Sequence, residues 1–207
     1  MANTNSPFGM KWIGMNGGAV TASSMVERRN GILSTNATAI YTNDMVMRSS
    51  NGYIYQWVAG TTARPLGVFA GCRYVSNSQQ TPVPQKYWPG TDAASGSVLA
   101  QYYPLMLTAP ALYVIQSDAT GVTQANLGFN CDIVVGTGST LNGFSGSYLD
   151  TTTISTTNTL PLTIVDLWTN YTTAGASGGS EVAGAGSTFI SGTQSGAYNW
   201  VVVAINS

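Results

Sequence analysis

The sequence predicts an all-β protein, and three observations support this fold class. Short segments rich in β-branched and aromatic residues recur along the 207-residue chain, separated by Gly, Pro and Asn. No segment of ten or more residues carries apolar residues at helical spacing. The hydrophobic content of 43% is enough to form a buried core. We therefore predict a single barrel or sandwich of short antiparallel strands at residues 31–207, after an extended N-terminal arm at residues 1–30.

The first 30 residues are predicted to form an arm because they mix Gly, Asn, Met and Ser without a sustained period. Phe8, Trp12 and Ile13 are large apolar residues spaced closely within this segment. Such spacing is typical of a segment that becomes ordered when it binds a partner. We predict that the arm is disordered in the free protein and that these three side chains contact a partner.

The first strand signal is a hairpin centred on Asn51-Gly52. An apolar run precedes this dipeptide, and a run of aromatic and β-branched residues follows it. Asn-Gly supplies the positive φ angles of a tight type I′ turn. The pattern predicts strands near residues 44–49 and 53–58.

Further strands are predicted in the segments "RPLGVFAGCRYV", "SVLAQYYPLMLT", "ALYVIQSD", "NCDIVVG", "LPLTIVDLW" and "YNWVVVAIN". In the first of these, Gly67 and Gly71 are expected to mark bends or close backbone approach. The last is apolar on both faces, which predicts a central strand. Long loops are expected near residues 76–96, rich in Pro, Gln and Ser, and near 170–197, rich in Gly, Ser and Thr.

The charge content argues against several classes of partner. Only 7% of the residues are charged, with seven basic and eight acidic side chains, whereas an average soluble domain has roughly 25%. This balance predicts no nucleic-acid partner and no membrane partner. A surface of Thr, Ser, Asn, Gln and Gly favours hydrogen bonding and protein contact. Without a signal-peptide pattern or a long apolar run, the protein is expected to be made and kept in a cytoplasm.

Residues suited to catalysis are scarce. Histidine is absent, which removes the usual general base and the commonest metal ligand. The eight acidic residues are scattered, and we expect Asp side chains to cap turns, with a carboxylate pair assembled by the fold left open as the alternative. Cys72 and Cys131 lie in apolar runs and are predicted to be buried reduced thiols, a disulfide being the alternative. We predict no enzymatic activity, no metal site and no cofactor.

The stretch "LGFNCDIVVGTGSTLNGFSGSYLD", residues 127–150, tests whether a glycine-rich loop binds phosphate. Gly136 and Gly138 follow a short strand, as in a dinucleotide-binding loop. That fingerprint also needs a third glycine and a helix, but Ser139, Thr140 and Leu141 follow and no stable helix is expected. We therefore predict a loop that joins two strands.

Aromatic residues could pack in a core or an interface, or stack on a ligand. Tyr55, Trp57, Trp88, Tyr102 and Tyr103 are the main candidates. Core or interface packing is the favoured interpretation and glycan binding the alternative, since so few positive charges disfavour nucleic acid.

Two aromatic neighbours, Tyr87 and Trp88, lie in the loop near residues 76–96. We predict that they contact a partner. The alternative is that both fold back onto their own domain.

With the strands placed, the chain resembles the capsid decoration or cement proteins of tailed bacteriophages. "MANTNSPFGMKWIGMNGG" is similar to the short Ala/Asn start of that family, followed by Pro-Phe-Gly and an arm. "YTNDMVM", a glycine turn and "RPLGVFAGCRYV" resemble its strand pair. The most specific part is the order of "ALYVIQSDATG", the 127–150 stretch, a Thr-rich linker, "LPLTIVDLW" and "WVVVAIN".

The resemblance implies a structural virion protein on the outer capsid surface, made in the host bacterial cytoplasm. Its partner would be the major capsid protein, and the chain is expected to form a homo-oligomer, a dimer or trimer. The expected contact residues are Phe8, Trp12, Ile13, Tyr87 and Trp88. The alternative is a phage receptor-binding or glycan-binding β domain, with Tyr87, Trp88 and Tyr171 on its long loops.

Overall fold

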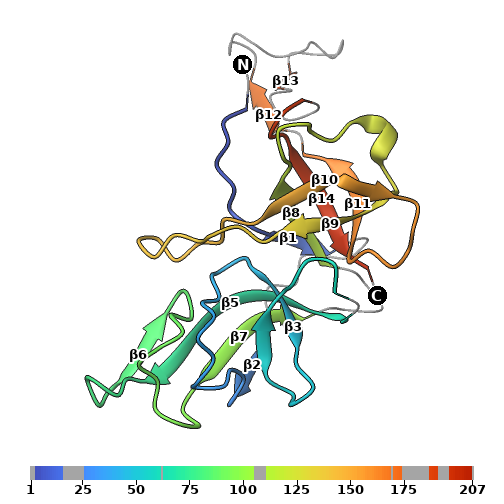
Figure 1. Ribbon diagram of the computed structural model, residues 1–207. Helices are drawn as coiled ribbons and strands as arrows, with labels where there is room; N and C mark the ends of the chain where they lie inside the picture. Colours follow the sequence, from blue (N-terminus) through green and yellow to red (C-terminus); the bar gives the residue numbers. More distant parts are fainter. Residues whose placement is uncertain are drawn as a thin grey trace.

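Two six-stranded antiparallel sheets form the body of the protein, one above the other in Figure 1. The structure is a computed structural model and describes residues 3–15, 26–61, 63–104, 111–168, 170–173, 187–190 and 196–206. In these residues the only helical element is the 3₁₀ turn η1 (Gln124–Asn126), so the all-β prediction is confirmed. The arrangement is sandwich-like, because neither sheet closes into a barrel.

The upper sheet has the strand order β1-β8-β14-β11-β9-β10. Its strands are β1 (Lys11–Met15), β8 (Ala111–Gln116), β14 (Trp200–Ile205), β11 (Leu162–Leu167), β9 (Asn130–Val134) and β10 (Tyr148–Ser155). The C-terminal strand β14 lies between β8 and β11, which confirms the central position predicted from its two apolar faces.

The lower sheet has the order β2-β7-β5-β3-β4, with β6 paired to the end of β5. Its strands are β2 (Val26–Arg29), β7 (Leu99–Pro104), β5 (Pro65–Val75), β3 (Met45–Arg48), β4 (Ile54–Gln56) and β6 (Pro82–Gln85). Strand β6 lies within the segment predicted as the first long loop. The second predicted loop contains the paired strands β12 (Asn170–Thr173) and β13 (Ser187–Ile190), and most of its other residues lie outside the described ones.

The predicted hairpin is confirmed as β3 and β4, but its turn differs from the prediction. The Gly52 N–H donates to the Ser49 carbonyl at 2.9 Å, and the Ser49 N–H donates to the Tyr53 carbonyl at 2.9 Å. Gly52 has a φ of 82°, whereas Asn51 keeps a negative φ. This is a type I turn closed by a left-handed glycine, and not the type I′ turn that Asn-Gly predicts.

Strand β5 is buried on both faces, and a bulge keeps its apolar residues in register. Val68 faces the upper sheet, and Phe69 faces the opposite side. The pairing of β5 with β7 shifts between Phe69 and Gly71. Because one extra residue reverses the alternation of a strand, Cys72 and Tyr74 lie on the same face as Phe69.

Two hydrophobic cores result from this arrangement. The inner core lies between the sheets, where Tyr113, Ile164 and Val203 of the upper sheet belong to one cluster with Met45 and Val68 of the lower sheet. The second core lies on the far face of the lower sheet. Residues from the connecting segments complete it: Ile32, Ile40, Trp88, Ala93 and Val98. Strands β3, β5 and β7 of the lower sheet therefore contribute side chains to both cores.

The N-terminal segment differs from the separate arm that composition predicts. Strand β1 pairs with β8 at the edge of the upper sheet, and Met10 is fully buried in the inner core. The Gly9 N–H donates to the Ser147 carbonyl at 3.1 Å, and the Met10 N–H donates to the Asn43 carbonyl at 2.8 Å. Because these backbone groups pair with the domain, residues 3–15 belong to it; residues 16–25 lie outside the described residues.

Candidate functional site

The two loop aromatics expected to contact a partner fold back onto their own domain. Trp88 is fully buried, its Nε1–H donates to the Asn36 carbonyl at 2.9 Å, and its ring packs edge-on against Tyr74. Tyr87 is half-buried and stacks on Tyr41 with ring centroids 5.2 Å apart. Trp88 is thus a core residue and is not available as a surface contact. Its burial completes the second core beneath the lower sheet.

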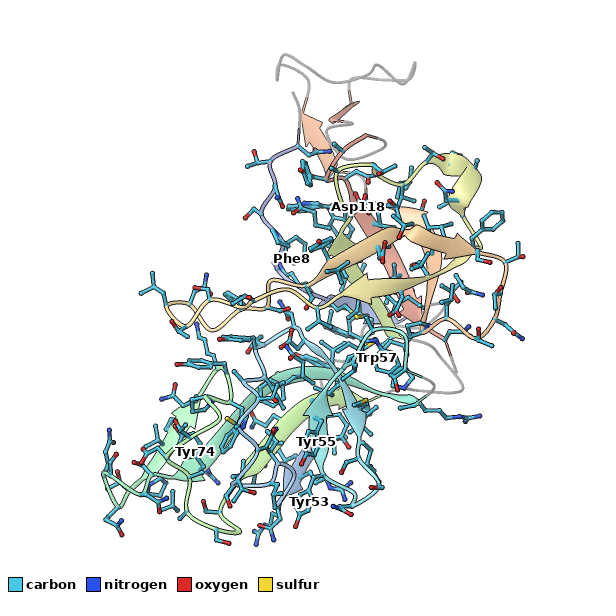
Figure 2. All side chains as sticks on the ribbon, viewed as in Figure 1. Phe8, Tyr53, Tyr55, Trp57, Tyr74 and Asp118 are labelled. Atoms are coloured by element: carbon cyan, nitrogen blue, oxygen red, sulfur yellow. The ribbon has the colours of Figure 1, made fainter. Side chains whose placement is uncertain are left out.

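The three N-terminal anchors separate onto two faces of β1. Trp12 packs on the inner core and stacks with Tyr103 at 5.7 Å, the two ring planes differing by 5°. Ile13, the next residue, lines a groove on the outer face, as the alternation of a strand requires. Phe8 lines the same groove ahead of β1 (Figure 2). Phe8 and Ile13 are therefore brought together, and Trp12 is not.

This groove, which we call the aromatic groove, has a volume of about 400 Å³. It lies where the N-terminal segment crosses the outer face of the upper sheet. Its lining residues are Phe8, Lys11, Ile13, Asn43, Val114, Phe144, Trp168 and Trp200. Phe8 and Trp200 pack edge to face at 5.3 Å with an interplanar angle of 75°.

Backbone pairing fixes the groove residues on one face. Lys11 of β1 pairs with Val114 of β8, and Val114 pairs with Val202 of β14. Trp200 points to the same side, two residues before Val202 along β14. The Phe8 carbonyl accepts a hydrogen bond from Asn43 Nδ2 at 3.0 Å, which ties the N-terminal segment to the lower half.

The chemistry of the groove is that of an apolar binding surface. Aromatic and aliphatic side chains dominate it, with one amide from Asn43 and one cation from Lys11. Phe144 at its edge is 38% exposed, and Lys86 Nζ lies 5.6 Å from its ring centroid. No carboxylate or thiol among the described residues lines it. The groove can hold apolar side chains, and Lys11 is the one titratable side chain among its lining residues.

Sequence reasoning found Phe8 and Ile13 but missed Phe144, Trp168 and Trp200. The alternation in β14 carried a usable signal, because Trp200 occupies an outward position of a strand whose inward positions are 201, 203 and 205. Nothing local in the sequence places Phe144 beside β1, since the contact depends on how the long loop between β9 and β10 folds.

Buried carboxylates join the two sheets through hydrogen bonds within the domain. Asp44 accepts hydrogen bonds from the Tyr41 N–H at 2.8 Å, Gln56 Nε2 at 2.9 Å, Ser145 Oγ at 2.5 Å and Ser147 Oγ at 3.3 Å. Burial raises the pKa of Asp44, and the four hydrogen bonds oppose that rise. The prediction that Asp residues cap turns is confirmed here, because the Tyr41 N–H belongs to a turn ending at Asp44.

A second buried carboxylate, Asp132 of β9, joins the sheets at another point. It accepts Trp57 Nε1–H at 3.1 Å and the Gly60 N–H at 2.7 Å, and Trp57 lies at the junction of the two halves in Figure 2. Asp150 of β10 lies opposite Asp132 and accepts the Thr152 N–H at 3.0 Å. The fold thus brings two carboxylates to neighbouring strands, but both oxygens of the buried one are already bonded within the domain.

Both cysteines are free and buried, which confirms the prediction of reduced thiols. Cys72 lies in the core beneath the lower sheet, and Cys131 lies in the inner core. Burial raises the pKa of Cys72 to about 12 and raises the pKa of Cys131 as well. Across the part of the chain that the structure describes, no three His, Cys, Asp or Glu residues cluster in a way that could hold a metal ion, and no helix has the length and apolar character to cross a membrane.

The glycine-rich loop joins β9 to β10, as predicted. It needs glycine at two positions, one where it packs on itself and one where it packs on Tyr41. A Cβ on Gly136 would lie 2.0 Å from the Gly146 carbonyl oxygen. A Cβ on Gly138 would lie 2.2 Å from the ring of Tyr41. Any side chain at either position would therefore clash with the neighbouring backbone or ring.

Comparison with known proteins identifies no relative. No protein-family model, no curated protein and no solved structure matches the chain.

Proposed function

We propose that this chain is a structural virion protein that binds the outside of a tailed-phage capsid and stabilises contacts between major capsid subunits. The observation that carries the proposal is the aromatic groove on the outer face of the upper sheet. The order of segments along the chain, which resembles that of phage cement proteins, supports it as well.

The groove suits a protein partner because of its size and chemistry. Aromatic residues are enriched at the centres of protein interfaces, where they supply large contact areas at low entropic cost. Its lining includes one charged side chain, Lys11, and Lys86 lies beside Phe144 at its edge. Apolar side chains of the major capsid protein are the occupants we propose. Because such contacts are screened little by salt, capsid affinity should fall less than about tenfold when salt rises from low to high concentration.

The proposed location is the capsid surface, where repeated copies act together. A copy that bridges two capsid subunits makes its second contact at a high effective concentration. We propose a symmetric dimer or trimer, because closed symmetry lets one surface patch pair with itself at a capsid symmetry axis. Sedimentation equilibrium of the purified protein tests this, and a monomer at all concentrations would contradict it.

The rival function, a glycan-binding domain, loses Trp88 from its proposed aromatic platform. Trp88 is buried, and one face of Tyr87 is covered by Tyr41. The side chain of Tyr171, the third aromatic of that hypothesis, lies outside the described residues.

The experiment is a capsid-binding assay with one groove variant and one matched control. Ile13→Asp places a charge in the aromatic groove, and Val58→Asp places one at an exposed apolar residue in the lower half, 56% exposed. We expect Ile13→Asp to weaken binding to capsids that lack the protein by at least about tenfold. Val58→Asp should bind as the wild type does. Equal binding by both variants, with both folded by circular dichroism, would contradict the role of the groove.

A further inference from the structure

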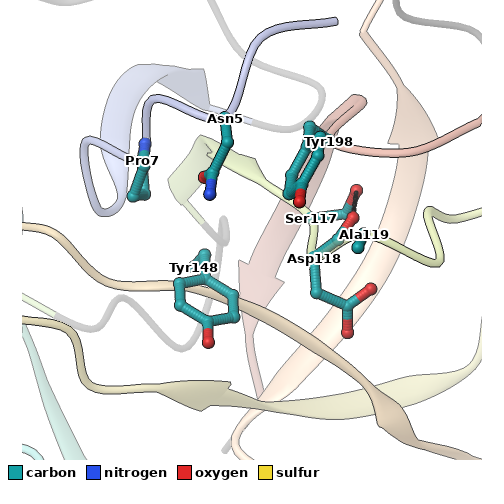
Figure 3. Close-up of a pocket in the computed structure, with 7 residues that line it drawn as sticks. All are labelled: Asn5, Pro7, Ser117, Asp118, Ala119, Tyr148 and Tyr198. Atoms are coloured by element: carbon teal, nitrogen blue, oxygen red, sulfur yellow. Dashed lines mark hydrogen bonds between the residues drawn. The ribbon is translucent and has the colours of Figure 1, made fainter.

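A second hollow in the upper half is lined by two tyrosines and a carboxylate (Figure 3). We call it the tyrosine pocket; its volume is about 340 Å³. Tyr148 and Tyr198 lie on two sides of it in Figure 3, with Asp118 beside Tyr198 and the Asn5 amide directed between the rings. It is distinct from the aromatic groove, with which it shares no lining residue.

The Asp118 carboxylate has its hydrogen-bonding capacity filled by its own chain. It accepts the Thr120 N–H at 2.8 Å, the Gly121 N–H at 3.4 Å, the Thr151 N–H at 2.9 Å and the Thr151 hydroxyl at 2.7 Å. Partial burial acts to raise the pKa of Asp118, but these hydrogen bonds outweigh it and the pKa is lowered. The side chain is therefore a fixed anion at neutral pH.

No cation of the protein neutralises this anion. All seven Lys and Arg residues lie in the described part of the chain; none lines the pocket, and none forms an ion pair with Asp118. Charge is also divided between the two halves. Residues 26–104 carry six basic and three acidic side chains, whereas residues 1–15 and 111–207 together carry one basic and five acidic. The half that contains the tyrosine pocket is thus acidic, although the whole chain is nearly neutral.

Tyr198 is held in a backbone conformation that tyrosine rarely adopts. Its φ is +57°, in the left-handed region. The Tyr198 N–H donates to the Asp118 carbonyl at 2.8 Å, and the Tyr198 carbonyl accepts Gln116 Nε2–H at 3.1 Å. Strained residues of this kind cluster at ligand-binding sites. Glycine or asparagine would adopt this backbone conformation at lower cost. The position thus carries a tyrosine whose ring lines the pocket.

The chemistry selects a cation over a sugar. A sugar has no charge to pair with the Asp118 anion, and its hydroxyls would have to compete for a carboxylate that already accepts four hydrogen bonds from its own chain. A cation is attracted by the uncompensated charge without displacing those hydrogen bonds, and also by aromatic faces that carry negative electrostatic potential. We propose that the tyrosine pocket receives one lysine or arginine side chain of a docked protein.

This inference rests on the proposed function in one respect, since it identifies the major capsid protein as the source of that side chain. Both hollows lie on the upper half, where the N-terminal segment supplies Asn5 to the tyrosine pocket and Phe8 to the aromatic groove. A capsid subunit that fills the groove with apolar side chains can therefore place a basic residue in the pocket. The modest salt dependence expected of capsid binding would come from this contact.

Titration of the purified protein, followed by ¹H–¹⁵N NMR, tests the chemistry without any capsid. The probes are Nα-acetyl-lysine amide and Nα-acetyl-arginine amide, with Nα-acetyl-norleucine amide as the uncharged match. We expect shifts confined to the amides of Ala119, Tyr148 and Tyr198 at about millimolar concentrations of the cationic probes. Equal shifts with norleucine amide, shifts with neutral monosaccharides alone, or no shift with either cation would overturn the proposal.

Tyr198→Asn separates a binding role from a structural one. Asparagine tolerates the left-handed conformation, so this variant should melt no lower than the wild type and yet lose the cation-dependent shifts. Tyr53→Asn in the hairpin loop of the lower half is the matched control and should keep them. A lower melting temperature with unchanged cation binding would overturn the assignment of Tyr198.

Capsid binding by the same variants identifies the source of the side chain. We expect Tyr198→Asn and Asp118→Asn to weaken capsid affinity about fivefold or more, as loss of one desolvated charge contact does. If the wild type binds capsids and both variants bind equally well, the capsid is not the source. Self-association of the wild type that Tyr198→Asn abolishes would assign the pocket to a second copy and overturn the capsid assignment. If no variant and no wild type binds capsids, the proposed function fails while the probe titration still decides the chemistry of the pocket.

Discussion

Asp44 joins the turn before β3 and strand β4 of the lower sheet to the loop that leads into β10 of the upper sheet. Its removal should therefore loosen the contact between the two sheets. Asp44→Ala leaves four donors without their acceptor: the Tyr41 N–H, Gln56 Nε2 and the hydroxyls of Ser145 and Ser147. An unsatisfied buried donor costs about 1–3 kcal/mol.

The serine hydroxyls can rotate toward other acceptors, and loss of the buried charge recovers part of its desolvation cost. We therefore expect Asp44→Ala to reduce the free energy of unfolding by about 3–5 kcal/mol, the range for breaking a buried charged network. For a chain of this size that corresponds to a melting temperature lower by about 6–20 °C.

Asp44→Asn is the informative comparison because it keeps the shape and one acceptor oxygen. Its carbonyl can accept from Tyr41 and Gln56, and its amide can donate to the rotated hydroxyls of Ser145 and Ser147. The expected cost is about 1 kcal/mol or less. Urea denaturation of both variants gives the two free energies. Equal losses for Asn and Ala, or a loss under about 1 kcal/mol for Ala, would refute the reasoning.

The same pair of proteins has a defined pH dependence. The pKa of Asp44 is higher in the folded than in the unfolded chain, so the folded state binds its proton more tightly. The stabilisation that comes from this tighter proton binding is complete below the ordinary pKa of about 3.9 and is lost as pH rises through the raised folded value. The wild type should therefore gain stability relative to Asp44→Asn as pH falls through that interval. A constant difference between the two proteins would contradict the raised pKa.

Three further outcomes follow from burial and backbone geometry. Trp88→Ala should cost about 3–5 kcal/mol by urea denaturation, against almost nothing for Val58→Ala, because Trp88 fills the second core; similar values for the two would mean that Trp88 is at the surface. Gly67→Ala should lower the free energy of unfolding more than Gly60→Ala does. Both glycines have a positive φ, but an added Cβ would lie 1.9 Å from the Tyr103 carbonyl oxygen at Gly67 and would meet nothing within 4 Å at Gly60. Both thiols should resist Ellman's reagent at neutral pH until the protein unfolds, since burial raises their pKa values; rapid reaction of the native protein would show that a cysteine is accessible.

Local chemistry made much of the fold predictable. Alternating or continuous apolar runs located the main strands, and the two apolar faces of residues 200–205 placed that strand at the centre of a sheet. The absence of a third glycine and of a helix identified the loop after Val135 as a connection. The turn at Asn51-Gly52 was predicted in position but not in type, because a type I turn with a glycine bulge uses the same residues.

The site depended on contacts between distant parts of the chain, and sequence patterns do not encode these. Trp88 lies in a Pro-rich segment typical of an exposed loop, yet its bridge to Ile40 carries it into a core. The N-terminal residues have no strand-like period, yet the edge of β8 offers backbone partners that order Lys11–Met15. The outward alternation at Trp200 was readable, but its pairing with Phe8 was not.

The most direct test of the proposed function is the heat stability of capsids with and without this protein. Particles that lack it should assemble but rupture at a lower temperature, and purified wild-type protein added back should restore the loss. Ile13→Asp, with its altered groove, should fail to restore it, and Val58→Asp should succeed. Depleted particles as heat-stable as complete ones, or a protein found only on tails, would contradict the account.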